Sequence, residues 1–405
     1  MTRLSRYFLA LLSAVPLAAQ TVPELIGVTA ATPLLRTRDM GTCAERACPP
    51  TGFPPMAAHP AAGGTAFDPG RGGAWISNGT HLACVTKDGC RFLCPTTPLS
   101  LAREFVSGLA VDETRRHLLL STTSNAIEVY ELDCPLGRRI SRCIAPVPAT
   151  HTIGGIATAD VEDFVIFSSS DFSGTAPPAN TLYVAARSAP CTPLCSVPIP
   201  RFCGTLGPIH GVAYDQCTRT VWVTDGFATL GMTIDLRTCT ISPTHCCAMT
   251  PPEPFIGLCV APSEGTTTGR NCIRPSCPPC AASMTIGTKG SPAIGNADFA
   301  ITLESAPAGG GAWLLLSFAG PCTGGMPTPT PFCGLLHVDF SFLIVLGGVP
   351  ITGGPAACGG TATMPVPVPA DLGLCGLHAC GQWLGICPLG GVFTSNALSF
   401  ALSGT

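Results

Sequence analysis

Two runs of alternating apolar and small or polar residues flank a polar turn in residues 211–225, GVAYDQCTRTVWVTD. An alternation with a period of two on either side of a turn predicts a strand, a tight connection and a second strand. The pattern begins again at Gly64, Gly108, Gly155 and, in a degenerate form, at Gly257, with intervals of 44, 47, 56 and 46 residues between successive glycines. A strand-rich repeat of this length is typical of a four-stranded propeller blade rather than of a helical solenoid.

The first strands after residue 20 have no such opening. Residues 22–48 contain an apolar strand, a polar strand and two cysteines, which is the pattern of the second half of a repeat, whereas the opening at Gly257 lacks a convincing second half. We expect the N-terminal strands to complete the blade that begins at Gly257, because closing the ring removes exposed strand edges. This arrangement predicts about five blades.

The pattern changes from residue 284 onward. Apolar strands in residues 312–319, 335–346 and 361–370 are separated by Gly and Pro turns, which suits a small antiparallel β-sandwich. The predicted fold class is therefore all-β, with a β-propeller of about five blades over residues 20–283 and a β-sandwich over residues 284–405.

Composition supports strands and turns over helices. Only 11% of the residues are charged, and the chain contains 46 Gly and 41 Pro, which both disfavour helix interiors. The apolar fraction of 46% and the net charge of -3 argue against disorder. Without a basic excess or a basic tract, nothing predicts nucleic-acid binding.

Residues 1–19 predict a secretory signal peptide. Arg3 and Arg6 precede a short apolar run, and small residues follow it at Ala18 and Ala19. An uncleaved amphipathic helix or a membrane anchor is the alternative, but the apolar run is too short to span a bilayer. No later segment predicts a transmembrane span, so we expect a secreted or cell-surface protein.

The 24 cysteines fit an exported protein that keeps them as disulfides. Eighteen precede Ala281 and six follow it, and two even numbers predict two domains that are cross-linked separately. Each repeat carries a close pair that we expect to close the outer hairpin of its own blade. These pairs are Cys43 with Cys48, Cys90 with Cys94, Cys134 with Cys143, Cys191 with Cys195, and Cys239 with Cys246 or Cys247.

Cys272, Cys277 and Cys280 form the densest cysteine cluster, and Cys277-Pro-Pro-Cys280 has the spacing of a redox motif or of half a zinc site. The prolines forbid the helix that a thioredoxin-like motif needs. Zinc would require a second pair of ligands, so structural disulfides are the favoured interpretation, and we expect neither a metal nor a cofactor.

Several recurring residues have structural interpretations. Asp68, Asp112 and Asp215 end the first strand of their repeats, where a carboxylate can bind the amides of a turn. Trp75 and Trp222 occupy matching positions in the second strand and are expected to pack between blades.

The repeated strand–turn–strand sequence resembles NHL-type extracellular propeller repeats, in which a G-x-A-x-D strand is followed by a hydrophobic strand and then by D-G or N-G. Here Asp225-Gly226 and Asn78-Gly79 carry that ending. The resemblance covers residues 20–280 and implies a fold rather than an activity.

The C-terminal block resembles a module of exported proteins of planctomycete-type bacteria. The matching segments are residues 294–303 (IGNADFAITL), residues 360–369 (GTATMPVPVP), Gln382 with Trp383, and residues 395–398 (SNAL). The resemblance implies export and attachment to a surface or matrix, and no chemistry.

His151 and His210 are the candidate polar residues of the channel mouth, because each lies just before an innermost strand. Asp171 and Asp225 are the acidic residues that could join them. A loop histidine bound to backbone is the alternative for each. Cys217 lies within the strand–turn–strand pattern of residues 211–225, and His210 lies directly before it. Neither residue recurs in the other repeats, so they mark what is specific to this chain.

The remaining carboxylates give no catalytic set. Asp160, Glu162 and Asp163 are expected in a solvated loop between strands, and there is no G-x-S-x-G, phosphate loop or EF-hand pattern.

We therefore expect a secreted, disulfide-rich binding or structural module at the cell surface or in the extracellular matrix, with an unidentified protein or glycan as its ligand. The alternatives are a hydrolase or lyase that uses the channel mouth, and an architectural subunit that assembles with copies of itself.

Overall fold

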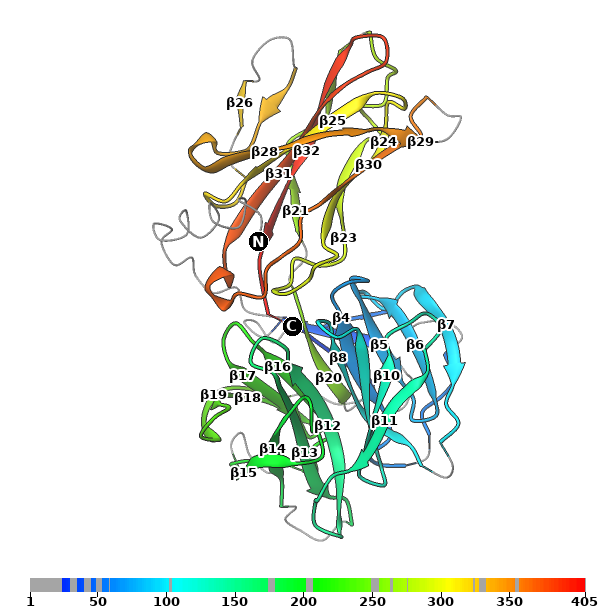
Figure 1. Ribbon diagram of the computed structural model, residues 1–405, viewed down its shortest axis with the longest axis vertical. Helices are drawn as coiled ribbons and strands as arrows, with labels where there is room; N and C mark the ends of the chain where they lie inside the picture. The colour runs from blue at the N-terminus through cyan, green and yellow to red at the C-terminus, as the bar shows by residue number, and fades with distance from the viewer. Residues whose placement is uncertain are drawn as a thin grey trace.

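The computed structural model has two lobes stacked end to end (Figure 1). It describes residues 24–29, 35–39, 45–48, 53–57, 59–101, 104–173, 179–201, 207–248, 255–262, 265–274, 276–322, 325–327, 333–353 and 357–404. We call residues 24–262 the propeller lobe and residues 265–404 the C-terminal lobe. The elements found in the described ranges are strands and two short 3-10 helices, and no helix there is long and apolar enough to cross a membrane.

Four sheets of the propeller lobe each form from four consecutive antiparallel strands. The first contains β4 (Gly64–Asp68), β5 (Gly73–Ser77), β6 (His81–Thr86) and β7 (Phe92–Pro98). The second contains β8 (Val106–Asp112), β9 (His117–Thr122), β10 (Ala126–Glu131) and β11 (Arg139–Ile144). The third contains β12 (His151–Ala159), β13 (Phe164–Asp171), β14 (Thr181–Ala186) and β15 (Pro193–Pro198). The fourth contains β16 (Gly211–Asp215), β17 (Thr220–Thr224), β18 (Ala228–Asp235) and β19 (Thr240–Ala248).

The fifth sheet joins distant parts of the chain. Its innermost strand, β20 (Phe255–Ala261), pairs antiparallel with β1 (Glu24–Thr29), which is followed outward by β2 (Leu35–Asp39) and β3 (Glu45–Cys48). The ring is therefore closed by hydrogen bonds between the N-terminal strands and the last propeller strand.

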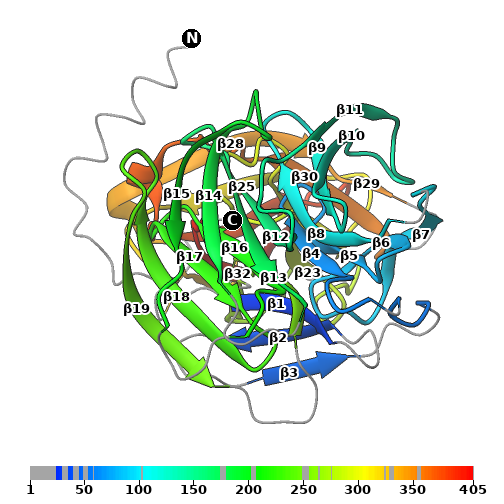
Figure 2. The same cartoon turned by 90° about the horizontal axis from the view of Figure 1, so that it is seen from below.

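The innermost strands β4, β8, β12, β16 and β20 each contact the next, and β20 contacts β4, so the sheets form a closed β-propeller (Figure 2). Five hydrophobic clusters hold it together, and each contains buried residues from two adjacent sheets. Trp75 packs with Leu109 of the next sheet, and Trp222 packs with Leu258 of the fifth. The expected packing of these tryptophans between sheets is confirmed.

Two further antiparallel sheets share one core in the C-terminal lobe. The larger contains β21 (Thr266–Thr268), β22 (Cys272–Ile273), β25 (Gly311–Ser317), β28 (Leu343–Pro350), β31 (His378–Ile386) and β32 (Val392–Ala401). The smaller contains β23 (Thr285–Lys289), β24 (Ala300–Ala306), β29 (Thr352–Gly353) and β30 (Gly360–Pro365). A hairpin of β26 (Met326–Pro327) and β27 (Leu335–Leu336) and the 3-10 helices η2 (Phe340–Phe342) and η3 (Leu372–Leu374) complete the lobe.

The Gln-Trp pair of the C-terminal lobe is structural. Gln382 is fully buried in β31, where its Nε2 donates to the carbonyls of Leu335 at 2.9 Å and Ser395 at 2.7 Å, and its Oε1 accepts from the amide of His337 at 2.9 Å. The neighbouring Trp383 fills the core. One amide thus fixes the segment around β27 to the larger sheet, and both of its N–H donors are used within the protein.

The disulfides of the propeller lobe join neighbouring sheets. Cys94 bonds to Cys134, Cys143 to Cys191 and Cys195 to Cys239, with Cα–Cα distances of 5.5, 5.9 and 6.2 Å. In each case a cysteine of one outermost strand bonds to a cysteine in the turn that precedes the outermost strand of the following sheet. We call these three bonds the disulfide belt.

The expectation that each pair closes its own hairpin is wrong for the six cysteines of the belt. The strand register explains this, since Cys143 lies opposite Ile127 and Cys195 opposite Val184, so the turn cysteine of the same hairpin is not the cross-strand neighbour. Cys90 and Cys246 are also disulfide-bonded, and Cys90 cannot pair with Cys94 as expected. The expected pair of Cys43 with Cys48 lies outside the described side chains.

The expectation of two separately cross-linked domains is also wrong, because Cys217 bonds to Cys375 and links the lobes. Three further bonds join a cysteine before residue 281 to one after it: Cys272 with Cys333, Cys277 with Cys387, and Cys280 with Cys358. A fourth, Cys322 with Cys380, lies entirely after residue 281. The Cys-Pro-Pro-Cys sequence therefore forms two separate structural disulfides, as favoured from the sequence.

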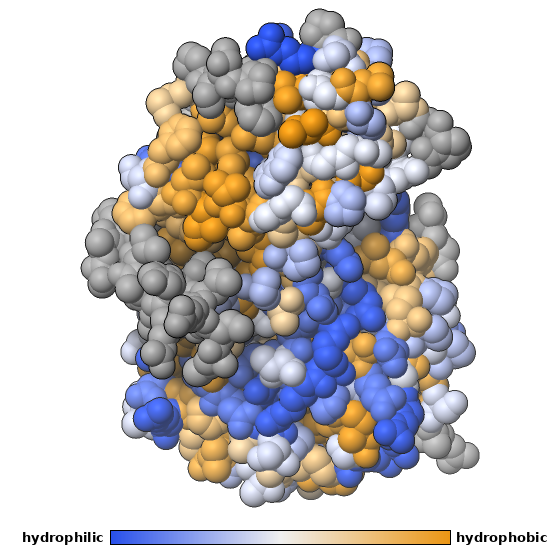
Figure 3. All heavy atoms as spheres, turned by 45° about the horizontal axis from the view of Figure 1, so that its top comes forward, coloured by the Kyte–Doolittle hydropathy of each residue, from blue (hydrophilic) through white to orange (hydrophobic). Residues whose placement is uncertain are grey.

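The two lobes differ in surface character. Hydrophilic residues spread across the propeller lobe, whereas apolar residues gather on the visible face of the C-terminal lobe (Figure 3). Exposed large apolar side chains of that lobe include Phe340, Val345 and Leu389.

Candidate functional site

A ring of glycine backbones surrounds the centre of the propeller, formed by Gly64, Gly108, Gly155, Gly211 and Gly257. A Cβ built on any of them would lie between 2.6 and 3.0 Å from backbone atoms of the next glycine around the ring. Side chains larger than hydrogen do not fit at such distances. The recurring glycine thus reflects close backbone approach between adjacent innermost strands.

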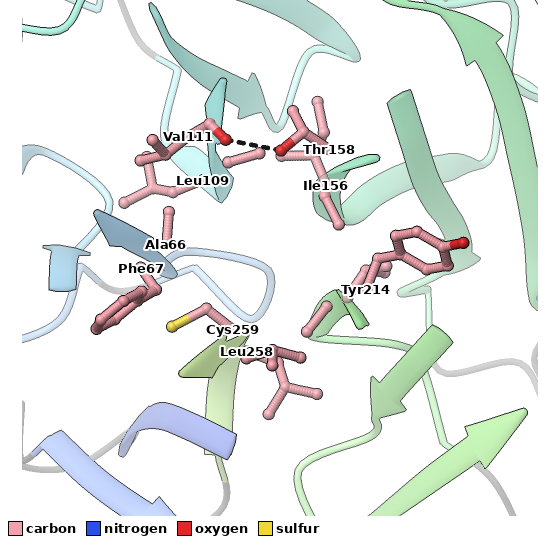
Figure 4. Close-up of a pocket in the computed structure, with 14 residues that line it drawn as sticks. Ala66, Phe67, Leu109, Val111, Ile156, Thr158, Tyr214, Leu258 and Cys259 are labelled. Carbon is pink, nitrogen blue, oxygen red and sulfur yellow. Dashed lines mark hydrogen bonds between the residues drawn. The ribbon is translucent and has the colours of Figure 1, made fainter. Parts of the chain in front are cut away.

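A small cavity of about 40 Å³ lies beside this ring, toward the ends of the innermost strands (Figure 4). Its walls are the apolar side chains of Leu109, Ile156 and Leu258, and the hydroxyl of Thr158 donates to the carbonyl of Val111 at 2.7 Å. The hydroxyl of Tyr214 points away from it (Figure 4). This volume suits one or two water molecules and no organic substrate.

The face at which the first strands end carries their hairpin turns, and we call it the turn face. Asp68 accepts from the amide of Arg71 at 3.1 Å, and Asp112 from that of Arg115 at 3.0 Å. Asp215 accepts from the amide of Cys217 at 3.0 Å. These bonds confirm that the recurring aspartates stabilise turns.

The C-terminal lobe lies on the turn face. The carbonyl of Pro69 accepts from the amide of Ser291 at 2.9 Å and from Nδ2 of the fully buried Asn296 at 3.0 Å. Gly404 lies so close to the turn after Asp215 that a Cβ on it would be 2.5 Å from that carboxylate. With the Cys217–Cys375 bond, these contacts place the C-terminal lobe over one end of the propeller.

Charged residues join neighbouring sheets at the turn face. The guanidinium of Arg187, 7% exposed, lies 2.7 Å from Asp112, 3.1 Å from Asp160 and 2.8 Å from Asp163. Asp163 is half exposed, but Asp160 is 9% and Glu162 17% exposed. The expectation of a solvated loop is wrong for these two, because the adjacent sheet packs over them.

Burial raises the pKa of two carboxyl groups in this network. The pKa of Asp160 is about 6, raised first by burial and then by Asp112, although Arg187 lowers it. Glu113 has a pKa of about 7, raised by burial and by Asp68 against the opposing effect of Arg116. Both groups bind protons more tightly in the folded than in the unfolded chain.

We predict that Glu113→Gln removes part of the pH dependence of stability. The pKa of Glu113 in the folded chain lies above the ordinary 4.5. The contribution of this group to the free energy of unfolding is therefore fully present below about pH 4.5 and is lost as the pH rises through 7. The loss at pH 8 amounts to about 3 kcal/mol for a shift of this size. Denaturant unfolding at pH 5 and pH 8 should show a smaller difference for Glu113→Gln than for the natural chain. Glu304→Gln, at an exposed carboxylate, is the control, and an unchanged difference for Glu113→Gln would contradict the prediction.

The opposite face carries His151 and His210, and we call it the histidine face. Nδ1 of His151 lies 3.1 Å from the hydroxyl of Ser169 on the adjacent strand. His210 packs edge-on against Phe172 with ring centroids 5.2 Å apart, and its amide donates to Thr224. Burial lowers the pKa of His210 to about 4, opposed by Asp225, so this imidazole is neutral at neutral pH.

The two aspartates of this face stabilise local turns. Asp225 accepts from the amides of Gly207 at 2.8 Å, Phe227 at 2.9 Å and Ala228 at 2.7 Å. Asp171 lies opposite His151 in the strand register and accepts from the amide of Ser173 at 2.8 Å. The fold thus brings His151 beside Asp171 and His210 near Asp225, in two adjacent sheets.

No cluster of three His, Cys, Asp or Glu side chains with metal-binding geometry occurs in the described part of the chain. Sequence reasoning missed a different group, formed by Glu162, Tyr214, Arg219 and Arg237, which line a cavity on the turn face. Residues from two sheets build it, so no local motif could have revealed it.

No family model and no curated protein matches the chain. Solved structures to which it is similar include a chain from the crystal structure of a nidogen/laminin complex, at 13% identity and a TM-score of 0.36, covering 59% of this chain and 98% of that one. Another is the β-propeller domain of Cps50 (Swd1) of Myceliophteria thermophila, at 12% identity and a TM-score of 0.33, covering 57% and 73%. A third is the WD40 domain of Toxoplasma gondii coronin, at 11% identity and a TM-score of 0.31, covering 56% and 60%. The assignment of this chain as a β-propeller depends on the closed ring of its own innermost strands.

Proposed function

We propose that the chain is a secreted, disulfide-bonded propeller of five blades with a C-terminal β-sandwich, and that it acts outside the cell as a binding or structural module. Each four-stranded sheet of the ring corresponds to one blade. We place the end of the propeller near residue 262 instead of 283, because β21 and β22 pair with β32 of the C-terminal lobe.

The disulfide belt is the observation that carries this proposal. Bonds between adjacent blades form and persist in oxidising compartments, whereas cytosolic thiols are kept reduced. The expected signal peptide, which lies outside the described residues, would deliver the chain to such a compartment. Together the belt and the Cys217–Cys375 bond support an extracellular location.

The geometry supports binding more than catalysis at the channel. A hydrolase or lyase would need room for a substrate, whereas adjacent innermost strands touch at the glycine ring and the cavity beside it has a volume of only about 40 Å³ and mainly apolar walls. The C-terminal lobe lies over part of the turn face, so we assign partner contact to the histidine face, at the opposite end of the propeller.

Phe227 is the residue we assign to partner contact on the histidine face. It follows Asp225 in the loop between β17 and β18, and its side chain is 66% exposed. Exposed aromatic side chains held by well-bonded turns are typical anchors of protein and glycan interfaces.

A quantitative capture experiment tests the proposal. Full-length protein is exported by an oxidising host, immobilised, and exposed to the surface extract of the source cells. We expect a defined partner that Phe227→Glu loses by about tenfold or more, while Leu389→Glu, at an 83% exposed side chain of the C-terminal lobe, retains it. Equal capture by both variants would exclude the histidine face, and failure of the chain to be exported would exclude the extracellular location.

A further inference from the structure

A cavity of about 550 Å³ lies on the turn face between the third and fourth sheets of the propeller. It is bounded by the β12–β13 turn, the β16–β17 turn and the β18–β19 turn. Its volume falls within the range of small-molecule sites in proteins, and it is more than ten times that of the central cavity. The cavity lies on the face opposite the histidines, so its ligand is independent of the partner proposed above.

One part of the cavity wall is apolar. Ile234 and Leu236 are 3% and 6% exposed, and Phe164 packs against the same hydrophobic cluster. Phe164 is only partly buried, so its ring offers a hydrocarbon surface on which the C–H face of a sugar ring can lie, whereas the two nearly buried aliphatic side chains support it from behind.

Glu162 supplies an acceptor. Its Oε1 accepts from the hydroxyl of Tyr214 at 3.2 Å and lies 3.8 Å from Nε of Arg219, whereas its Oε2 is buried without a hydrogen-bond partner among the described residues. Burial raises the pKa of this carboxyl group. An unsatisfied oxygen of this kind is costly, and a hydroxyl donor from a ligand would satisfy it.

Two guanidinium groups supply the complementary charge. Arg219 is 66% exposed and makes only the long contact with Glu162 among the ion pairs of the described residues. Asp235, which also lines the cavity, fixes the backbone of the β18–β19 turn, because its carboxylate accepts from the amides of Arg237 at 2.9 Å and Thr238 at 3.3 Å. No described residue pairs with the guanidinium of Arg237, which is thus available to a carboxylate.

We propose that this cavity binds a uronic acid, as a free acidic sugar or as a residue of a glycan. Its carboxylate pairs with Arg237 and Arg219, its ring hydroxyls donate to Glu162, and its C–H face lies on Phe164. A neutral hexose offers no carboxylate to the guanidiniums.

Titration calorimetry of the full-length protein with glucuronate tests this assignment. We expect saturable binding with a Kd of about 1 mM or tighter, and no measurable heat with glucose. Arg237→Gln should weaken glucuronate binding by about tenfold, because one charge-assisted pair is lost.

Arg91→Gln is the matched control, since Arg91 is exposed in the equivalent turn of the first sheet. It should leave the affinity unchanged, and the circular dichroism spectra of both variants should match that of the natural chain. Equal affinity of Arg237→Gln and the natural chain would overturn the proposal. So would binding of glucose at the same affinity, or tighter binding of glutamate, since glutamate would identify the site as one for amino acids.

Discussion

Gly211→Ala is expected to destabilise the propeller by about 3 kcal/mol or more, because overpacking that displaces backbone costs 1–3 kcal/mol and sometimes more. A Cβ at this position would lie 2.6 Å from the carbonyl carbon of Gly257, which belongs to the backbone of the next strand and cannot rotate away. In a closed ring, displacing one innermost strand also displaces its neighbours. Thermal unfolding should show the melting temperature lowered by about 5 to 10 °C.

Gly347→Ala is the matched control for this change. Gly347 lies in β28 of the C-terminal lobe, and a Cβ on it would meet nothing within 4 Å. Its replacement should alter stability by about 0.5 kcal/mol at most. A melting temperature for Gly211→Ala equal to that of Gly347→Ala would mean that the adjacent innermost strands do not approach each other this closely.

The strand pattern of the propeller could be predicted because each repeat obeys local rules. The period-two alternation around Ala213 and Trp222 specifies which side chains face the neighbouring sheet, and Asp215 ends the first strand by binding the amide of Cys217. The glycine that opens each repeat is visible in the sequence, but the structural reason for a glycine at that position is not. Five glycines that lie far apart in the chain meet only at the centre of the ring.

The disulfides could not be predicted because sequence proximity does not measure spatial proximity here. Cys191 and Cys195 are four residues apart, yet each bonds to a cysteine 44 or 48 residues away in an adjacent sheet. Cys217 could be singled out in part, because the other repeats have no cysteine at the equivalent position. The structure shows that it holds the C-terminal lobe on the propeller.

The candidate site was harder to infer than the fold. His210 and Asp225 do come near each other, as the hypothesis of a channel-mouth site required, but their contacts are those of turns and packing. The cavity that contains Glu162, Arg219 and Arg237 depends on three turns from two sheets. Those residues have no shared spacing, so only their meeting in space identifies them.

A double-mutant cycle should distinguish the pairing of the disulfide belt from the alternative in which cysteines pair within one hairpin. Cys195→Ser breaks the bond between Cys195 and Cys239, which closes a segment with a sequence separation of 44. The chain-entropy model gives about 4 kcal/mol for a loop of this size. Because Cys239→Ser breaks the same bond, the variant with both changes should be about as stable as either single variant, and the coupling energy should be large.

Cys191→Ser combined with Cys195→Ser provides the contrast. The belt assigns these cysteines to different bonds, Cys143–Cys191 and Cys195–Cys239, so their effects should add to about 8 kcal/mol. Pairing within the hairpin requires the reverse, with additive losses for Cys195 and Cys239 and no further loss for Cys191 after Cys195. Denaturant unfolding of the four variants under non-reducing conditions distinguishes the two arrangements. If the losses are additive for Cys195 with Cys239, the sheets are not linked in this way, and the extracellular proposal loses its main support.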